Sequence, residues 1–270
     1  MLYYLYDGTF EGLLTCVFDV YYRNETPARI VNEDIPLPLF TDAHQVISDD
    51  EKARRVLEGL RKKISKSAIN MLYYCHLSEI QDIELILLRY IQKALASPIS
   101  IEVNFADDDV LALSKIYKKV SNERTHILQF VRFQKTADGM YFAVMDPIYN
   151  VLPLCADFFQ DRYADQQWIV YDTRRNFGLF YDLTKTEIVR FDHPPVNLKT
   201  GKISAEQQDE TEKAFQTLWK DYLQAITIQP RKNLRLQRQF MPKRFWKYLI
   251  EKEEVSRPFQ ASSMDALFEN

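Results

Sequence analysis

The stretches HILQFVRFQKTADGMYFAVMD, residues 126–146, and WIVYDTRRNFGLFYDLTKTEIVRF, residues 168–191, decide the predicted fold. Both are rich in the β-branched and aromatic residues that favour strands. The first stretch turns at residues 137–139, where glycine can supply a positive φ, and this pattern predicts a hairpin. Residues 174–176 and 184–185 divide the second stretch into three strands. Connections this short join antiparallel neighbours.

The segments before and after this region have helical periodicity. The sequence therefore predicts an α+β fold, in which an antiparallel sheet of about five strands, from residue 126 to residue 191, packs against N-terminal and C-terminal helices. We expect residues 1–252 to form a single domain, within which a helical part, 1–105, and a sheet-containing part, 106–252, can be distinguished. The polar residues 253–270 are expected to form a flexible tail.

Composition excludes several classes of protein. A hydrophobic content of 46% is enough for a core, and a formal charge of -3 argues against a uniformly basic nucleic-acid coat. Three cysteines, Cys16, Cys75 and Cys155, lie far apart and indicate neither disulfides nor a metal site. The chain has no Gly-rich phosphate loop, no CxxxCxxC motif and no apolar run long enough for a membrane. We therefore expect a cytoplasmic protein without a cofactor or membrane partner.

Two helix predictions affect the search for a site. The acidic triplet at residues 107–109 precedes a helical apolar pattern, so it is interpreted as a helix start and not as a metal site. Ser204 and Gln207 have the spacing of a capping box and are expected to begin a long C-terminal helix. The apolar stripe of that helix is expected to be buried in the core. It comprises Phe215, Leu218, Trp219, Tyr222 and Ile226.

Candidate catalytic residues are few. His126, at a predicted helix-to-strand junction, could act as a general base or could bond a neighbouring backbone group. Asp172 and Asp182 follow predicted strands, where they could form a carboxylate pair or initiate turns, and turn formation is favoured. Arg174 and Arg175 could clamp a phosphate or could pair with these acids.

The segment from residue 229 to residue 250, which we call the basic segment, is the clearest functional signal. It holds seven cations and no acid, so the rest of the chain carries a formal charge of -10. Aromatic residues are interleaved with the cations, as in proteins that bind a phosphate backbone and stack on bases. The alternatives are that the rings pack on the core, or that the segment binds an acidic protein. The predicted nucleic-acid-binding residues are Arg231, Lys232, Arg235, Arg238, Lys243, Arg244, Trp246 and Lys247, together with Arg174 and Arg175.

Four stretches resemble one bacterial family of probable DNA metabolism proteins, which carries a domain of unknown function. They are LYDGTFEGLLTCVFDVY at 5–21, QFVRF at 129–133, WIVYDTRRNFGLFYDL at 168–183 and MPKRFWKYL at 241–249. Similar proteins occur beside a radical S-adenosylmethionine (radical SAM) protein assigned to DNA repair, and some are fused to a uracil-DNA-glycosylase-like domain. The resemblance implies an accessory role in DNA repair or modification with that protein as a partner, and it assigns no catalytic residue.

Three functions follow from these observations. The favoured one is a non-catalytic DNA-binding accessory protein, with strand preference open. The second is a nucleic-acid-processing enzyme, such as a nuclease or glycosylase, that uses His126, Asp172 and Asp182. The third is a protein adaptor for the radical SAM partner. A continuous positive surface would favour the DNA-binding function. A pocket that joins a histidine, a carboxylate and an arginine would favour the enzyme, and an exposed apolar patch would favour the adaptor.

Overall fold

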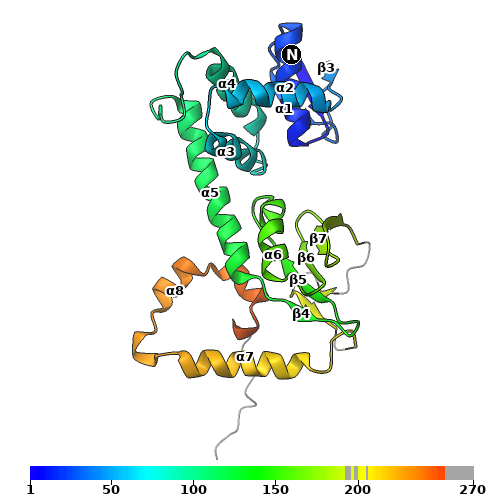
Figure 1. Cartoon of the computed structure of the whole chain (residues 1–270), viewed down its shortest axis with the longest axis vertical. Helices are drawn as coiled ribbons and strands as arrows, with labels where there is room; N and C mark the ends of the chain where they lie inside the picture. The colour runs from blue at the N-terminus through cyan, green and yellow to red at the C-terminus, as the bar shows by residue number, and fades with distance from the viewer. Residues whose placement is uncertain (192–195, 198–199, 205, 253–270) are drawn as a thin grey trace, which may run out of the picture. The chain divides into compact units, whose positions relative to one another are not determined.

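The computed structural model forms two compact units (Figure 1). Unit 1 comprises Met1–Leu128 and Pro147–Phe158, and unit 2 comprises Gln129–Asp146 and the chain from Phe159 onward. The single domain of residues 1–252 stays a prediction. The structure describes residues 1–191, 196–197, 200–204 and 206–252. The predicted tail, residues 253–270, lies outside the described residues.

Unit 1 is built on a small parallel sheet. Its central strand β1 (Leu2–Tyr6) lies between β2 (Arg29–Asn32) and β3 (Asp42–Gln45). Helix α1 (Phe10–Arg23) connects β1 to β2 and begins after Thr9, whose side chain accepts a hydrogen bond from the Gly12 amide. The apolar stripe of α1 is buried, because a helix that crosses between two parallel strands packs on the sheet.

Three of the four remaining helices of unit 1 begin after a polar residue whose side chain accepts hydrogen bonds from free backbone amides. The exception is α4, where the side chain of Asp82 makes no such bond. Before α5, Asp107 accepts hydrogen bonds from the Asp109 and Val110 amides, and Asp109 is bound by Arg89 and Lys93. The interpretation of the acidic triplet as a helix start is therefore confirmed. These helices are α2 (Asp50–Arg61), α3 (Lys66–His76), α4 (Ile83–Ala96) and α5 (Asp108–Phe130).

The predicted strand at residues 126–130 is wrong, because α5 continues to Phe130. Its buried positions include Val120 and Ile127, seven residues apart. This helical spacing extends the apolar stripe past His126. The β-branched and aromatic composition of residues 126–133 favoured a strand. Residues 126–130 are nevertheless helical, because they continue the buried apolar stripe of α5.

Unit 2 contains a five-stranded sheet with the order β4-β5-β6-β7-β8. The predicted hairpin at Gly139, which has a φ of 88°, and the antiparallel β6-β7-β8 meander are both confirmed. The prediction that the sheet is wholly antiparallel is wrong, because β5 and β6 are parallel. The strands are β4 (Gln134–Lys135), β5 (Tyr141–Met145), β6 (Trp168–Asp172), β7 (Phe177–Tyr181) and β8 (Thr186–Val189).

The parallel pair follows from the connection between its strands. Parallel neighbours need a crossover of a dozen or more residues, and the chain between β5 and β6 contains η1 (Leu152–Cys155) and α6 (Ala156–Arg162). The α6 residue Phe159 is fully buried, and its ring lies 5.8 Å from that of Trp168 in an edge-on contact. A short hairpin of β9 (Val196–Asn197) and β10 (Lys202–Ile203) follows the sheet.

The C-terminal part of unit 2 begins with α7 (Glu212–Ile226), eight residues after Ser204. The predicted start at Ser204 is wrong because the chain first runs along β4, where the Asp209 amide donates to the Lys135 carbonyl oxygen. Ser204 does bond the Gln207 side chain, but no helix follows it there. The elements after α7 are η2 (Gln229–Arg231), α8 (Leu234–Phe240), η3 (Lys243–Tyr248) and η4 (Ile250–Lys252).

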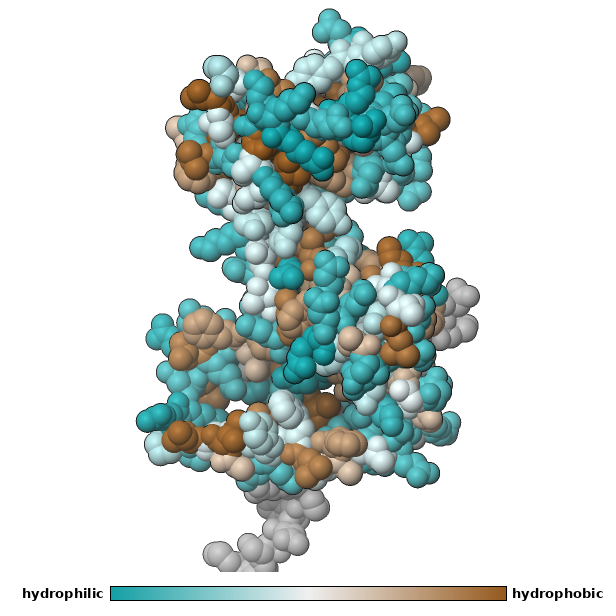
Figure 2. Space-filling model, in the orientation of Figure 1, coloured by the Kyte–Doolittle hydropathy of each residue, from teal (hydrophilic) through white to brown (hydrophobic). Residues whose placement is uncertain are grey.

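The apolar stripe of α7 is exposed, so the prediction that it is buried is wrong. Leu218 is 63% exposed and Trp219 is 37% exposed, and Phe215, Tyr222 and Ile226 are exposed as well. Figure 2 shows hydrophobic side chains along the surface of this helix. Helical periodicity identified the face correctly, but it could not show whether another part of the chain covers it.

We expect the substitution Gly178→Ala in β7 to destabilise unit 2 by about 1–3 kcal/mol. A Cβ atom there would lie 3.0 Å from the Val170 carbonyl oxygen and 2.9 Å from the Tyr171 ring, so the backbone or ring must shift. All three tryptophans of the chain, Trp168, Trp219 and Trp246, belong to unit 2. Urea denaturation followed by tryptophan fluorescence therefore reports on this unit.

The comparison variant is Gly59→Ala in α2 of unit 1, and its unfolding is followed by far-ultraviolet circular dichroism because unit 1 contains no tryptophan. There, a Cβ atom would meet only the end of the Leu95 side chain, at 3.3 Å, and alanine has the higher helix propensity. We expect this variant to keep the wild-type midpoint or exceed it. An unchanged midpoint for Gly178→Ala would show that the close approach is not a constraint.

Candidate nucleic-acid interface

The basic segment belongs to unit 2 and exposes most of its cations. The five cations nearest its N-terminal end are all exposed. None of their side chains makes a hydrogen bond or an ion pair with the described part of the chain. They are Arg231, Lys232, Arg235, Arg238 and Lys243. Because these charges face solvent and are not neutralised by any acid of the described residues, they can bind an external anion.

The aromatic side chains of the segment have two roles. Phe245 and Tyr248 are buried, and the Phe245 ring lies 5.4 Å from that of Phe130. These two rings pack in the core of unit 2 and anchor the C-terminal end of the segment there. Trp246 is half-buried, and its Nε1 donates to the Met241 carbonyl oxygen at 3.0 Å. Phe240, in contrast, is 65% exposed and lies among the free cations.

Asp146 connects the basic segment with the turn between β6 and β7. Arg174 Nε donates to Asp146 Oδ1 at 3.0 Å, and Lys247 Nζ lies 3.4 Å from Asp146 Oδ2. Although burial opposes it, pairing with these two cations holds the pKa of Asp146 below its usual value. The structure thus brings two predicted site residues together around one carboxylate. Arg244 is half-buried, with its guanidinium 4.2 Å from the centre of the Phe245 ring.

The three candidate catalytic residues are held by separate local interactions. His126 lies within α5, in unit 1, with Nδ1 3.8 Å from the Glu123 carboxylate. Asp172 and Asp182 belong to unit 2 and lie at opposite ends of β7. The strand's five residues place the two carboxylates more than about 10 Å apart, which is too far for a shared metal ion or proton.

Asp172 is fully buried and forms the β6–β7 turn. Its Oδ1 accepts hydrogen bonds from the Arg174 and Arg175 amides, and its Oδ2 accepts one from Arg175 Nη1 at 2.9 Å. Burial raises the pKa of Asp172, and the hydrogen bond and charge of Arg175 oppose that shift. Arg175 therefore serves the turn and is 13% exposed at its side chain.

Asp182 forms the β7–β8 turn in a similar way. Its Oδ1 accepts hydrogen bonds from the Thr184 hydroxyl and amide and from the Lys185 amide. These bonds lower the pKa of Asp182 to about 2. The turn interpretation of both aspartates is confirmed.

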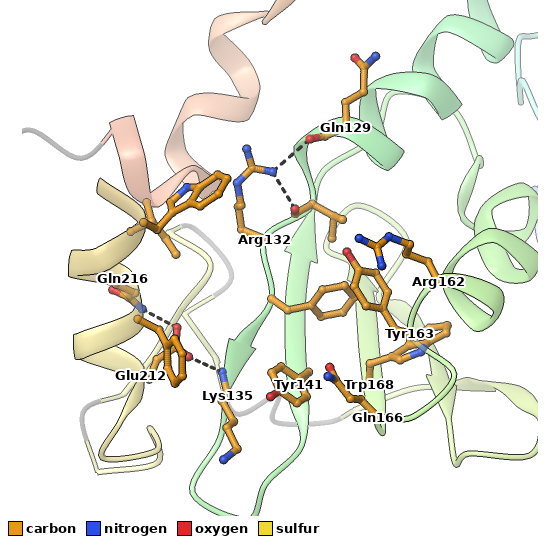
Figure 3. Close-up of a pocket in the computed structure, with 15 residues that line it drawn as sticks. Gln129, Arg132, Lys135, Tyr141, Arg162, Tyr163, Gln166, Trp168, Glu212 and Gln216 are labelled. Atoms are coloured by element: carbon orange, nitrogen blue, oxygen red, sulfur yellow. Dashed lines mark hydrogen bonds between the residues drawn. The ribbon is translucent and has the colours of Figure 1, made fainter. Parts of the chain in front are cut away.

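A cleft that sequence reasoning missed opens in unit 2 between the sheet, the end of α6 and α7. Its volume is about 820 Å³. Figure 3 shows side chains from these three elements facing a common space. Its residues are dispersed along more than a hundred positions, so no local motif could have indicated it. The lining includes Arg132, Phe133, Lys135, Tyr141, Arg162, Tyr163, Gln166, Trp168, Glu212, Phe215, Gln216, Trp219 and Ile250.

A smaller cleft of about 440 Å³ lies in unit 1, at the carboxyl ends of β1 and β2. His76 Nε2 lies 3.2 Å from the Gly8 carbonyl oxygen, and burial lowers the pKa of His76. Burial raises the pKa of Glu84, whose carboxylate accepts a hydrogen bond from the Tyr6 hydroxyl at 3.0 Å. Both shifts favour the uncharged side chain. The cleft is also lined by the ion pair of Arg29 with Asp82.

Within the described residues, no group of three or more His, Cys, Asp or Glu side chains is placed to hold a metal ion. Among the described helices, none combines the length and apolarity that a membrane span needs.

Comparison with known protein families gives one match, over residues 81–251, which is more than half of the chain. The chain belongs to the DUF4130 family, a domain of unknown function. The matched residues contain the whole basic segment and all the residues that line the larger cleft. Neither a curated protein nor a solved structure gave a match. DUF4130 membership agrees with the resemblance of the sequence and carries no established activity.

We expect Asp172→Ala to destabilise unit 2 by about 3 kcal/mol, because it removes one partner of a buried ion pair and leaves two turn amides without an acceptor. Asp182→Ala removes a turn carboxylate that is only half-buried, and its effect should be distinctly smaller. Urea denaturation followed by tryptophan fluorescence measures both. Equal midpoints for the two variants would contradict the structural role assigned to Asp172.

Proposed function

We propose that this DUF4130 protein is a DNA-binding accessory protein of a repair or modification pathway. The observation that carries the proposal is the exposure of Arg231, Lys232, Arg235, Arg238 and Lys243 in a segment with no acid. A cation without a local counter-charge can release the counterions of a phosphate backbone, and this release drives much of DNA binding.

The distribution of charge supports a single binding surface. The rest of the chain has a formal charge of -10, so a polyanion approaches most favourably at the basic segment. Within α8, Arg235 and Arg238 are three residues apart and lie on one helical face. Phe240 is exposed beside them and offers a ring to an unpaired base.

The choice of DNA among polyanions rests on the resemblance to probable DNA metabolism proteins. The same resemblance supports a radical SAM repair protein as a partner. The structural roles of Asp172 and Asp182 support a binding function over nucleic-acid hydrolysis, because both carboxylates already satisfy turn amides.

We expect fluorescence anisotropy with labelled DNA to show binding that weakens steeply with salt. If about five cations meet phosphates, log K falls with log salt with a slope of about -3.5 for single strands and about -4.5 for duplex. The triple variant Arg235→Glu, Arg238→Glu, Lys243→Glu should lose most of the affinity and reduce the slope by about 2 to 3.

The matched control is Lys115→Glu, Lys118→Glu, Lys119→Glu on α5. These lysines are exposed and have no ion pair with the described residues, so the control changes the net charge by the same amount. It should bind DNA nearly as the wild type does. Equal losses in both variants would show a general charge effect and no site, and absence of binding by the wild type would remove the proposal.

A second function, protein adaptor, is favoured by the exposed apolar stripe of α7. An apolar stripe on an amphipathic helix suits a hydrophobic groove on a partner. We propose the radical SAM protein as this partner, because similar proteins occur beside it.

Replacement of Leu218 and Ile226 by serine should weaken co-elution with the radical SAM protein, because it removes apolar surface from the docking face. Size-exclusion chromatography of the mixed proteins measures the effect. Ile188→Ser, at an exposed apolar position on β8, is the control and should leave co-elution intact. Co-elution that survives the loss of both α7 side chains would exclude this face.

A further inference from the structure

We propose that the larger cleft of unit 2 receives an unpaired nucleobase of a single-stranded DNA, with a neighbouring phosphate on Arg162. This inference deepens the proposed function and rests on it. It assigns the binding of bases to the cleft, whereas the basic segment binds the phosphate backbone.

The walls of the cleft suit a flat, apolar ligand. Tyr141, Tyr163, Phe215 and Trp219 line it from β5, the end of α6 and α7. Phe215 and Trp219 are exposed, so part of this aromatic surface faces solvent. A volume of about 820 Å³ accommodates a nucleotide, since small-molecule sites span about 300–1,000 Å³. Stacking on such rings is available to any base.

The charges of the cleft leave one cation free. Arg132 Nη2 pairs with Glu251 at 2.7 Å, and Lys135 Nζ pairs with Asp209 at 3.1 Å. Arg162 is exposed and has no acidic partner in the described part of the chain. Its guanidinium lies 5.6 Å from the centre of the Tyr163 ring. A planar cation beside an aromatic wall can bind a phosphate bidentately or stack on a base.

The cleft and the basic segment are joined at one end. Glu251, directly after the segment, accepts hydrogen bonds from Arg132 Nη2 at 2.7 Å and from Trp219 Nε1 at 3.2 Å. Ile250, the last residue of the segment, lines the cleft itself. The C-terminal end of the basic segment therefore borders the cleft.

The test compares Arg162→Glu with Arg190→Glu, a reversal of an exposed arginine of unit 2 that does not line the cleft. The probes are a short oligothymidylate, a fully paired duplex and thymidine monophosphate. Anisotropy with the oligothymidylate should show about a tenfold loss for Arg162→Glu, as for a lost charge-assisted contact, and little change for Arg190→Glu. The duplex should bind both variants equally, because its bases are paired.

Tyr163→Leu tests stacking separately from charge. It keeps an apolar side chain but removes the ring, and it should weaken oligothymidylate binding about fivefold or more. Oligothymidylate should also quench the fluorescence of wild-type tryptophans, two of which, Trp168 and Trp219, line the cleft.

The outcomes separate this inference from the proposed function. If both cleft variants bind the oligothymidylate as the wild type does, while the basic-segment variant does not, DNA binding stands and the cleft proposal is overturned. If thymidine monophosphate binds with dependence on Arg162 and no DNA binds, the cleft serves a free nucleotide and the proposal is likewise overturned. Binding of the oligothymidylate that depends on Arg162 and on Tyr163 supports it.

Discussion

The packing of Phe245 against Phe130 is the contact on which the rest of the site depends. The seven cations of the basic segment cannot by themselves hold it in a fixed position, because like charges repel one another and are best solvated by water. Burial of Phe245, Tyr248 and Leu249 in unit 2 supplies the missing attraction. The apolar side chains of the segment's end therefore determine where its charged side chains are presented.

The same anchor organises the cleft. Glu251 follows the buried residues and ties the side chains of Arg132 and Trp219 to one carboxylate. Burial opposes ionisation of this group, but Arg132 holds the pKa of Glu251 below its usual value, so the carboxylate stays charged. Glu251 thereby neutralises Arg132, while Lys135 pairs separately with Asp209. Within the described residues, Arg162 is left as the cation of the cleft that can respond to a ligand.

Local signals predicted the elements of this chain better than their pairing. The β6–β7–β8 meander, the Gly139 turn and the turn aspartates follow from short-range chemistry, and all are found. The parallel β5–β6 pair depends on a crossover whose course no local pattern specifies, and the end of α5 depends on packing that overrides strand propensity. For the candidate site, the sequence indicated the basic segment, because its cations lie within one short stretch of the chain. The cleft was not predicted, because its lining residues come from elements far apart in the sequence. The apolar stripe of α7 was predicted to be buried, because helical periodicity identifies an apolar face but does not show what covers it.

The crossover between β5 and β6 makes the two units interdependent in sequence. The chain leaves unit 2 after Asp146, contributes Pro147–Phe158 to unit 1 and then returns. The Asn150 amide, for example, donates to the Leu77 carbonyl oxygen within unit 1. No single cut in the polypeptide therefore separates the two units and leaves both intact. During synthesis, the first unit stays incomplete until part of the second has left the ribosome, so recombination or truncation at any one point damages at least one of them.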